Sequence, residues 1–465
     1  MDKRVQTAKY IVSDLVASLV VWLLFNLMRY REVAVYEGFE SINTYLYHTI
    51  SQKGQMLIPF FWSALFWLSG YYSKPYSRSR LTELFSTFTT VLVGVVILFF
   101  VLVLNDLPRS YQIYYDMFFT LFALQFVGIY IPRLAITQSG IGKIKRGELA
   151  LRVIVIGTGK KAASIAKELK ALGYCIAGFV DDSPGSGDEV AVDSILGDIG
   201  SLGTFVKECG ADELVVATES TENSHFTDIL YSLYCFKLPI KLLADRCGSL
   251  TMRIKTIKGA PLVDITDNNF LPIEQNVKLL MDKFVSLLSL LILSPLFLYI
   301  AWRVRRDSEG PVFFCQERIG YMGKPFTIYK FRTMYVGSER QGPSLSSEDD
   351  SRITPFGRVM RKYRLDELPQ FWNVLKGDMS LVGPRPERKY FIDKIAKSAP
   401  YYYLLHNVKP GITSLGMVKY GYAGSVEQMI ERMKYDILYY ENMSLLLDLT
   451  ILIYTVKTVI TGKGV

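Results

Sequence analysis

Four long apolar runs in the first third of the chain limit what this protein can fold into. They extend over about residues 11–28, 56–72, 84–104 and 111–131. A helix needs about 20 residues to cross a bilayer, and each run is near this length. The second and the fourth runs are marginal. The alternative interpretation is that these runs form buried core helices. Four such runs in series fit that interpretation poorly. We therefore expect four transmembrane helices within residues 1–138.

The basic residues beside these runs predict how the membrane region is oriented. Lys74, Arg78 and Arg80 lie between the second and third runs, whereas Arg109 is the one basic residue between the third and fourth. Because cytoplasmic loops carry an excess of lysine and arginine, the N-terminus should lie in the cytoplasm. Everything after the fourth run should lie there too, since basic residues follow that run as well.

The composition of the chain indicates which classes of partner it can bind. Half of the 465 residues are hydrophobic, and the formal net charge is +9. A basic and apolar chain suits an anionic membrane surface or an anionic substrate. We expect no nucleic-acid partner, since no nucleic-acid motif is present and the basic residues cluster beside apolar runs. The five cysteines show no metal-ligand spacing, which favours reduced thiols on a cytosolic face.

The middle region, residues 139–270, predicts an α/β domain. Residues 152–156 have the pattern of a buried strand that leads into a glycine turn, Gly157-Thr-Gly159, and a helix. Further strand candidates alternate with helical stretches, as in a Rossmann-like parallel sheet. Asp181 stands where a ribose ligand could. Gly157, Gly159 and Asp181 are therefore candidates for nucleotide binding, but the motif is only Gly-x-Gly-x-x-Ala, and we favour a regulatory or structural domain.

A fifth apolar run, about residues 284–302, is interrupted by Ser294 and Pro295 and has basic residues on both sides. Such flanks fit poorly with a membrane crossing, and proline bends a helix. We expect a re-entrant helix over about residues 279–303 that turns at Ser294 and Pro295 and returns to the cytoplasmic face. The final run, about residues 443–460, has polar residues along one helical face and predicts an interfacial amphipathic helix.

Two adjacent carboxylates, Asp366 and Glu367, lie among arginines and before a Gly-Pro-Arg-Pro turn that contains Arg385. Pro369 is tolerated in the first turn of a helix, so we expect a helix from Asp366 with this carboxylate as N-cap. Helix N-termini and arginine forks both attract phosphate. The carboxylates therefore suit a nucleophile or a metal ligand that acts on a phosphate; the alternative is a plain helix cap beside a solvated basic face.

Several stretches together resemble the large monotopic bacterial polyprenyl-phosphate phosphoglycosyl transferases, also described as the bacterial sugar transferase family. The matching stretches are residues 310–320, 330–334, 365–387 and 408–413. The order of membrane helices, Rossmann-like domain and C-terminal domain is also that of the large members. The chain departs from the family at residues 414–417, which are Ser-Leu-Gly-Met where Gly-Trp-Ala-Gln is common. This departure concerns substrate preference rather than the reaction.

The resemblance implies that residues 271–465 form an α+β catalytic domain at the cytoplasmic face of the bacterial inner membrane. It implies the transfer of a sugar-1-phosphate, expected to be a hexose-1-phosphate, from a UDP-sugar to undecaprenyl phosphate with release of UMP. This is the first membrane step in the synthesis of exopolysaccharide, capsule or O-antigen. The sugar, the pathway and a homodimeric state stay open.

The resemblance also implies roles for residues at matching positions. Asp366 would be the nucleophile that forms a phosphosugar-aspartate, which undecaprenyl phosphate then attacks. Glu367 would hold Mg²⁺, a hard cation that prefers oxygen ligands. Contacts to the substrate phosphates would come from Lys330, Arg332, Arg361 and Arg385.

A membrane-anchored NAD-dependent sugar-nucleotide dehydratase or epimerase is the alternative function, since some of these enzymes have membrane helices before a Rossmann fold. They need a Tyr-x-x-x-Lys pair downstream of the glycine turn. The one match, Tyr390 with Lys394, lies too far along the chain. A non-catalytic scaffold is a third alternative, but the intact carboxylates and arginines argue against it.

Overall fold

The computed structural model describes most of the chain. The described residues are 3–35, 38–73, 80–101, 110–145, 151–171, 173–182, 190–191, 194–219, 226, 229–230, 232–236, 238–243, 262–264, 270–338 and 350–461. The chain divides into two compact units, one of residues 1–150 with 271–277 and one of residues 151–270 with 278–465. Lys74, Arg78 and Arg109, on which the expected orientation partly depends, lie outside the described residues.

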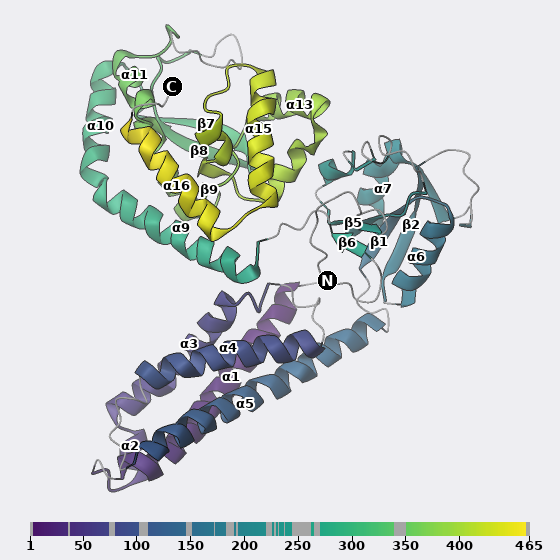
Figure 1. Ribbon diagram of the computed structural model, residues 1–465. Helices are drawn as coiled ribbons and strands as arrows, with labels where there is room; N and C mark the ends of the chain where they lie inside the picture. Colours follow the sequence, from purple (N-terminus) through teal and green to yellow (C-terminus); the bar gives the residue numbers. More distant parts are fainter. Residues whose placement is uncertain are drawn as a thin grey trace. The chain divides into compact units, whose positions relative to one another are not determined.

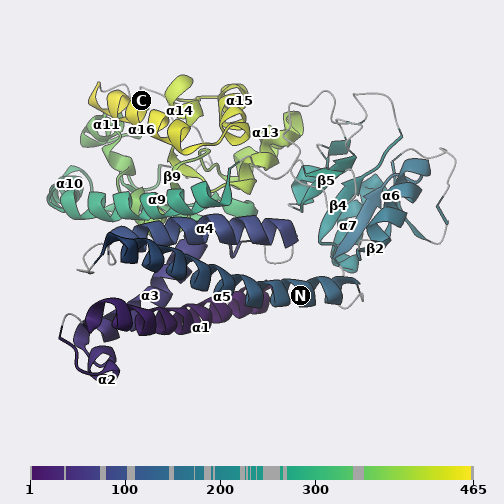
Figure 2. The ribbon, with the colours of Figure 1, turned by 60° about the horizontal axis from the view of Figure 1, so that its bottom comes forward.

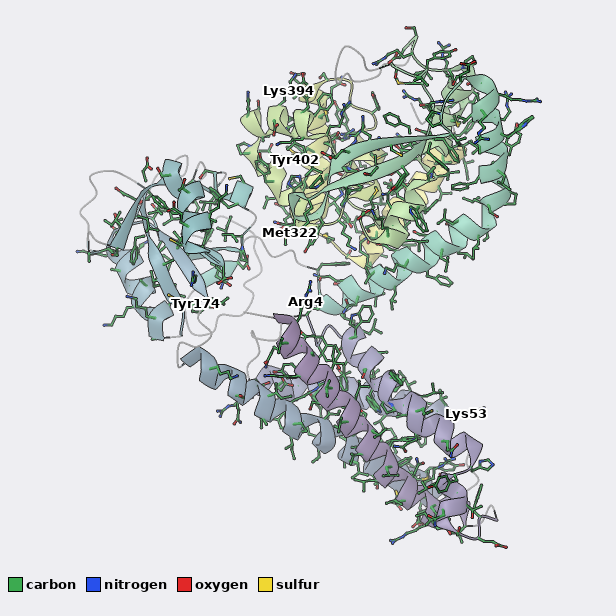
Figure 3. The ribbon with its side chains drawn as sticks, turned by 180° about the vertical axis from the view of Figure 1, so that it is seen from behind. Arg4, Lys53, Tyr174, Met322, Lys394 and Tyr402 are labelled. Carbon is green, nitrogen blue, oxygen red and sulfur yellow. The ribbon has the colours of Figure 1, made fainter. Side chains whose placement is uncertain are left out.

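The described residues of the first unit form four long helices. Figures 1 and 2 show them beside one another. They are α1 (Lys3–Arg29), α3 (Thr49–Leu68), α4 (Arg80–Val101) and α5 (Tyr111–Lys145), with a π-helical turn at Tyr30–Ala34 and a short α2 (Ile42–Leu46). Of the residues that the structure describes, three stretches are long and apolar enough to cross a membrane: 4–34, 83–101 and 111–140. The helix α3 is not among them, and Lys53 is exposed near its beginning (Figure 3). The expected count of four membrane helices stays a prediction.

A buried charge pair connects two of these helices. Arg133 of α5 donates hydrogen bonds to both carboxylate oxygens of Asp14 of α1, at 2.8 and 2.5 Å. Its guanidinium also lies over the rings of Phe66 and Tyr71, 3.9 and 3.5 Å from their centroids. A charge inside an apolar bundle needs such partners, so the pair fixes how α1 and α5 pack. The helix α5 continues to Lys145, so the boundary expected at residue 138 lies within it.

The α/β domain contains the predicted parallel sheet. Its strand order is β3-β2-β1-β4-β5-β6; all neighbours pair in parallel except β5 with β6. The helix α6 (Lys160–Ala171) follows β1, and α7 (Leu202–Cys209) follows β3. Buried side chains form a cluster on each face of the sheet, as expected for strands that are covered on both sides. The strands are β1 (Arg152–Ile156), β2 (Cys175–Asp181), β3 (Ile195–Asp198), β4 (Glu213–Val216), β5 (Ile240–Leu243) and β6 (Leu262–Asp264).

The C-terminal domain begins with two helices that meet at a sharp bend (Figure 1). They are α9 (Pro272–Ile292) and α10 (Ser294–Asp307), and the angle between them is 63°. The bend occurs at the expected residues, because Pro295 has no N–H for the hydrogen bond that a continuous helix would need. Ser294 Oγ donates to the carbonyl oxygen of Leu291 at 2.8 Å, which helps to satisfy the end of α9.

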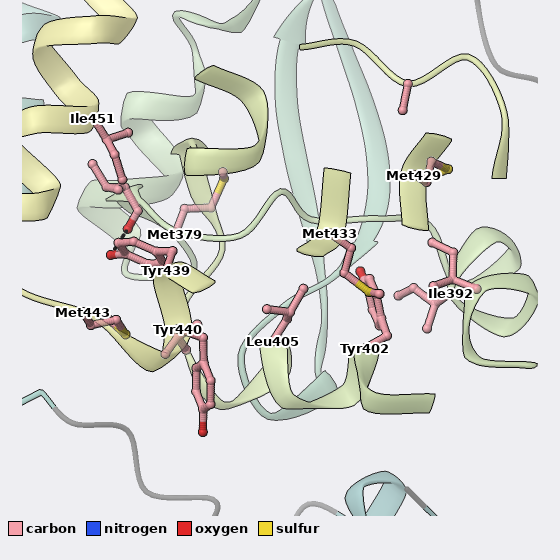
Figure 4. Close-up of a cluster of buried hydrophobic side chains, with 14 of the residues drawn as sticks. Met379, Ile392, Tyr402, Leu405, Met429, Met433, Tyr439, Tyr440, Met443 and Ile451 are labelled. Atoms are coloured by element: carbon pink, nitrogen blue, oxygen red, sulfur yellow. Dashed lines mark hydrogen bonds between the residues drawn. The ribbon is translucent and has the colours of Figure 1, made fainter. Parts of the chain in front are cut away.

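The rest of this domain packs helices around two small sheets. An antiparallel pair is formed by β7 (Phe313–Ile319) and β8 (Pro325–Phe331), and a parallel pair by β9 (Ser380–Val382) and β10 (Gly411–Thr413). The core includes Tyr402, Met433 and Tyr439 (Figure 4). The helices are α11 (Pro355–Lys362), α12 (Gln370–Lys376), α13 (Lys389–Ser398), α14 (Leu415–Lys419), α15 (Val426–Glu441) and α16 (Leu445–Ile460).

Candidate active site

The adjacent carboxylates lie in a tight turn between α11 and α12. Leu365–Glu367 form a short 3₁₀ helix there. Both side chains are almost fully buried, with 8% of Asp366 and 5% of Glu367 exposed. A buried carboxylate stays ionised only where cations or hydrogen-bond donors hold it. The neighbours of this turn therefore decide its chemistry.

Asp366 is not the N-cap of a helix, so this prediction was wrong. The helix α12 begins at Gln370, and Pro369 takes the N-cap position. The preceding residues form hydrogen bonds of the 3₁₀ type, from Glu367 N to Arg364 O at 3.2 Å and from Leu368 N to Leu365 O. The carboxylate of Asp366 is therefore not used to satisfy the helix.

Glu367 is surrounded by cations. Its Oε1 accepts a hydrogen bond from Lys330 Nζ at 2.7 Å and another from Arg385 Nη2 at 3.1 Å. Arg364 Nη1 lies 3.8 Å from its Oε2. Burial alone would raise the pKa of Glu367, but Lys330 and Arg385 hold this pKa well below its ordinary value. Glu367 is therefore a fixed negative charge at the centre of the site.

Asp366 has the opposite environment. Burial and the neighbouring charge of Glu367 raise the pKa of Asp366, although Lys330 and Arg361 act against this rise. Within the described part of the chain, no group donates a hydrogen bond to its carboxylate. Two adjacent carboxylates whose pKa values are pushed apart commonly have different chemical roles. Asp366, which accepts no hydrogen bond from the described residues, suits a nucleophile, whereas Oε1 of Glu367 is held by Lys330 and Arg385.

The Gly-Pro-Arg-Pro turn follows β9 and brings Arg385 to Glu367. The turn needs Gly383, because a Cβ atom there would lie 2.3 Å from the carbonyl oxygen of Lys409. Arg385 Nη1 also lies 3.1 Å from the sulfur of Met417. Met417 belongs to the segment in which the sequence departs from the family pattern, so this departure is in contact with the site.

A buried ion triad holds the other end of the same turn. Glu387 accepts a hydrogen bond of 2.6 Å from Arg432 of α15 and lies 3.3 Å from Arg318 of β7. Arg318 also donates to the carbonyl oxygen of Pro386 at 3.1 Å. Because a buried pair that loses one partner leaves an uncompensated charge, these contacts fix the position of Arg385 firmly.

Two of the predicted phosphate contacts differ in their placement. Arg361 donates to Thr333 Oγ1 at 3.0 Å, and its charge acts on Asp366. Arg332 instead donates to the carbonyl oxygen of Ser308 at 2.7 Å. Burial lowers the pKa of Arg332, and the charge of Asp307 acts against this fall. The structure therefore brings Lys330, Arg361 and Arg385 to the carboxylates, whereas Arg332 as a phosphate contact stays a prediction.

Arg364 is one of several basic residues before the carboxylates, and no pattern in the sequence distinguishes it from the others. This residue has φ 56° and ψ 22°, in the left-handed region that a bulky side chain rarely adopts. The conformation places its guanidinium beside Glu367. No sequence pattern marks a non-glycine residue with positive φ, so its position next to the pair was not predictable.

A second candidate site lies in the α/β domain, where Gly157 and Gly159 follow β1. Gly157 has φ +114°, which glycine adopts without strain. The place at the beginning of α6 that a phosphate would take is filled by the domain itself. Glu219 Oε1 accepts a hydrogen bond of 3.2 Å from Lys161 N, and a Cβ atom on Gly159 would lie 2.5 Å from the same oxygen. Asp181, the expected ribose ligand, ends the neighbouring strand β2.

Comparison with known proteins decides the family. Residues 273–462 match the family described as bacterial sugar transferase, and residues 68–243 match one described as CoA-binding domain. An undecaprenyl-phosphate galactose phosphotransferase of Salmonella typhimurium is 30% identical over 366 residues, which cover 71% of this chain and 72% of that protein. The chain belongs to the bacterial sugar transferase family. The resemblance seen in the sequence is thereby confirmed.

Other members of the bacterial sugar transferase family match over shorter stretches. A UDP-N-acetylgalactosamine-undecaprenyl-phosphate N-acetylgalactosaminephosphotransferase of Aeromonas hydrophila is 40% identical over 216 residues, 45% of this chain and 51% of that protein. A UDP-glucose:undecaprenyl-phosphate glucose-1-phosphate transferase of Klebsiella pneumoniae is 34% identical over 291 residues, 61% of this chain and 62% of that protein. The chain thus spans between about half and two thirds of the length of these two relatives.

The carboxylate pair of this bacterial sugar transferase fits a magnesium ion only with help from a substrate. Among the described residues, no group of three or more His, Cys, Asp or Glu side chains could hold a metal. Magnesium, however, is often bound by one or two carboxylates together with substrate phosphates. The donor set of Asp366 and Glu367 fits that arrangement.

The description of the second family implies that coenzyme A could bind the α/β domain. The residues at the glycine turn do not fit this ligand. Its pyrophosphate would have to displace the carboxylate of Glu219 from the beginning of α6. It would also meet Asp182, which accepts a hydrogen bond from Thr218, and Asp181 beside it. Three carboxylates repel an anionic ligand. No step of the proposed chemistry depends on this domain.

Proposed function

We propose that this transferase moves a sugar-1-phosphate from a UDP-sugar to undecaprenyl phosphate and releases UMP. The observation that carries the proposal is the buried pair of Asp366 and Glu367 among cationic side chains. A diphosphate donor and a phosphate acceptor are both anions, so the transfer needs positive charge to bring them together. The relatives support the proposal, because each is named as an undecaprenyl-phosphate sugar phosphotransferase.

The chemistry divides into two displacements. In the first, a carboxylate oxygen of Asp366 attacks the phosphorus next to the sugar, and the bond to UMP breaks as UMP leaves with the electron pair. In the second, an oxygen of undecaprenyl phosphate attacks the same phosphorus, and Asp366 leaves as a carboxylate. A covalent intermediate replaces one difficult transfer between two anions by two easier steps.

The site geometry supports Asp366 rather than Glu367 as the nucleophile. Glu367 Oε1 is engaged by Lys330 and Arg385, so its attack would require two charge-assisted hydrogen bonds to break. Asp366 receives no hydrogen bond from the described residues. Glu367 instead orients Lys330 and Arg385, whose remaining donors can bind phosphate oxygens.

Magnesium is part of the proposal. Glu367 would be its protein ligand beside Asp366, and phosphate oxygens of the donor would complete the coordination. When bound, the ion supplies positive charge that neutralises the phosphates. We expect transfer to stop in excess chelator and to return when Mg²⁺ is added. Glu367→Gln should lose activity and should also unfold at a lower temperature, because Lys330 and Arg385 lose their buried anionic partner.

The bent helix pair supports a re-entrant anchor. Basic residues flank it on both sides, and its exposed side chains are apolar, among them Phe284, Leu291 and Leu298. We propose that α9 and α10 enter and leave the bilayer from the cytoplasmic face of the inner membrane, with α16 at the interface. This arrangement brings a cytosolic nucleotide sugar and a membrane lipid to one site.

The donor sugar is proposed to be a hexose or an N-acetylhexosamine. The relatives are named for glucose, galactose and N-acetylgalactosamine, so kinship does not choose among these. The reaction would open the synthesis of a cell-surface polysaccharide. The dehydratase alternative is not favoured, because the relatives are named as phosphotransferases.

The test is turnover of the full chain in lipid nanodiscs that contain undecaprenyl phosphate. UDP-glucose, UDP-galactose and UDP-N-acetylgalactosamine are offered separately, and UMP and the lipid product are measured. The proposal expects UMP release with at least one donor and none with Asp366→Asn. Turnover of a sugar nucleotide with NAD reduction, and without UMP, would support the dehydratase instead.

A further inference from the structure

An apolar cavity of about 440 Å³ lies beside the carboxylate pair. Ligand sites in proteins typically have volumes of about 300–1,000 Å³, mostly apolar walls and a few polar groups. This cavity has that character, since its charged lining residues are Arg364 and Glu367. The other lining residues are Val285, Ser289, Leu368, Phe371, Leu381, Ile412, Thr413, Met417, Val418, Leu452, Thr455, Val456, Thr458, Val459 and Ile460.

Two helices with apolar outer surfaces form the walls of this cavity. Val285 and Ser289 of α9 line it on one side, and Val456 of α16 lines it on the other. On their outer surfaces the same helices expose apolar side chains, including Leu288 at 45% and Ile453 at 62%. A ligand that arrives from a bilayer would therefore meet an apolar path into the cavity.

A hydrogen bond couples one wall to the active site. Thr455 of α16 and Thr413 of β10 share a hydrogen bond of 2.7 Å between their hydroxyl groups. The strand β10 pairs with β9, which leads directly into the turn that carries Arg385. The position of α16 is thus fixed relative to the residues that hold Glu367.

Arg364 forms the charged end of the cavity. It is one of two described non-glycine residues with positive φ, the other being Met322. Such conformations persist where the surrounding structure enforces them, and they cluster at ligand sites. Its one ion pair in the described part of the chain is the 3.8 Å contact with Glu367, which is too long for a hydrogen bond. The guanidinium therefore keeps donors for an anion.

We propose that this cavity binds the lipid acceptor, with the phosphate of a polyprenyl phosphate on Arg364 and the first part of its isoprenoid chain between α9 and α16. The inference rests on the proposed function and adds the place of its second substrate. Of the two charged lining residues, Glu367 is already paired with Lys330 and Arg385, so Arg364 is the one that can take an anion. Apolar walls with this guanidinium at one end match an apolar chain with one anionic head. A nucleotide sugar is polar along its whole length and does not match these walls. The acceptor phosphate would then lie two residues from Asp366, where the second displacement occurs.

The first test measures binding and needs no turnover. A photoreactive short-chain prenyl phosphate is cross-linked to the full protein in nanodiscs, and the modified peptides are identified by mass spectrometry. The label is expected on α9 around Val285 and on α16 around Val456, and unlabelled prenyl phosphate should compete with it whereas phosphatidic acid should not. Label on other segments, or equal competition by phosphatidic acid, would overturn the proposal whatever UMP release shows.

Matched variants separate the cavity from the outer surface of the same helix. Leu452 lines the cavity and is only partly exposed, so Leu452→Trp should narrow the cavity. Ile453→Trp places the same side chain on the exposed surface of α16. The Michaelis constant for the acceptor should rise at least tenfold for Leu452→Trp, while the rate of UMP release without acceptor stays close to that of the wild type. It should stay within twofold for Ile453→Trp. Equal effects of the two variants would contradict the assignment.

The charged end is tested by Arg364→Gly. Glycine adopts positive φ without strain, so the turn should form while the guanidinium is absent. Cross-linking of the prenyl phosphate should fall at least tenfold, and Arg364→Lys should recover part of it. Unchanged cross-linking in Arg364→Gly would show that this residue does not bind the acceptor head.

Discussion

Lys330 Nζ lies 2.7 Å from Glu367 Oε1, whereas its neighbour Asp366 receives no hydrogen bond from the described residues. The two carboxylates are adjacent in the chain and similarly buried, yet among the described residues cations donate hydrogen bonds to Glu367 and none to Asp366. This asymmetry moves their pKa values in opposite directions. It gives each carboxylate a separate task, and it makes the chemistry testable residue by residue.

The first prediction concerns the covalent intermediate. Incubation with labelled UDP-sugar alone should leave sugar phosphate on the protein and release UMP before any acceptor is added. Asp366→Asn should abolish the label, because an amide is a far weaker nucleophile than a carboxylate. Asp366→Glu should lose on the order of 100-fold, since an added methylene moves the attacking oxygen by about 1 Å. Retained transfer by Asp366→Asn, with ternary-complex kinetics, would instead support direct attack by the acceptor.

The second prediction concerns Lys330. Its charge lowers the pKa of both carboxylates, so Lys330→Met should raise both values. Asp366 attacks in its ionised form, and the rate falls as pH drops through the pKa of Asp366. The acid limb of the rate of UMP release should therefore move to higher pH, and the maximal rate should fall on the order of 100-fold. Lys330→Arg keeps the charge and should leave the acid limb close to that of the wild type.

The sequence identified the carboxylates and Arg385, because their spacing in the chain is a family pattern. It also predicted the parallel sheet and the bend at Ser294 and Pro295, since alternating apolar strands and an interrupting proline are local signals. Prediction from the sequence failed for features of the site that depend on backbone geometry. The 3₁₀ turn that removes Asp366 from capping and the positive φ of Arg364 are imposed by tertiary packing. Arg332 as a phosphate contact stays a prediction, since its Nη2 donates to the carbonyl oxygen of Ser308 just after β8 has ended.

The third prediction concerns Asp436, which accepts a hydrogen bond from Gly416 N at 2.8 Å. Burial raises the pKa of Asp436 to about 6. Because the folded state binds its proton more tightly than the unfolded state does, this group makes the protein less stable as pH rises from about 4 to about 6. The full effect is about 3 kcal/mol. Asp436→Asn should remove this part of the pH dependence.

Thermal unfolding of the wild type and Asp436→Asn in the same detergent, from pH 4 to pH 7, measures the effect. Asparagine can still accept the hydrogen bond of Gly416, so the comparison isolates the charge. The stability of the variant relative to the wild type should increase across this range and level off above about pH 6. If the difference in stability between the two proteins did not change with pH, the raised pKa of Asp436 would be contradicted.

The fourth prediction concerns Glu219 in the α/β domain. Because its carboxylate takes the place of a phosphate at the beginning of α6, the wild type should show no saturable binding of coenzyme A or NAD at about 1 mM, the range of weak affinity. Glu219→Ala frees the amide of Lys161 and should allow an anionic ligand to bind. Titration calorimetry on the full chain measures both proteins. Tight binding of coenzyme A by the wild type would mean that Glu219 moves aside.

The last prediction concerns the bent helix pair. If α9 and α10 form a re-entrant anchor, the residues before α9 and after α10 lie on the same side of the membrane. Single cysteines at Ile273, in the first turn of α9, and at Glu309, after α10, mark the two ends of the pair in a variant without the five native cysteines. A membrane-impermeant maleimide should label both in inverted vesicles and neither in spheroplasts. A cysteine at Ser110, beside the loop expected outside, should show the reverse pattern and serves as the control. Labelling of Ile273→Cys and Glu309→Cys from opposite sides would mean that the pair crosses the bilayer. In that case the arginine-rich site would lie away from the nucleotide sugars of the cytoplasm, and the proposed route of the donor would fail with it.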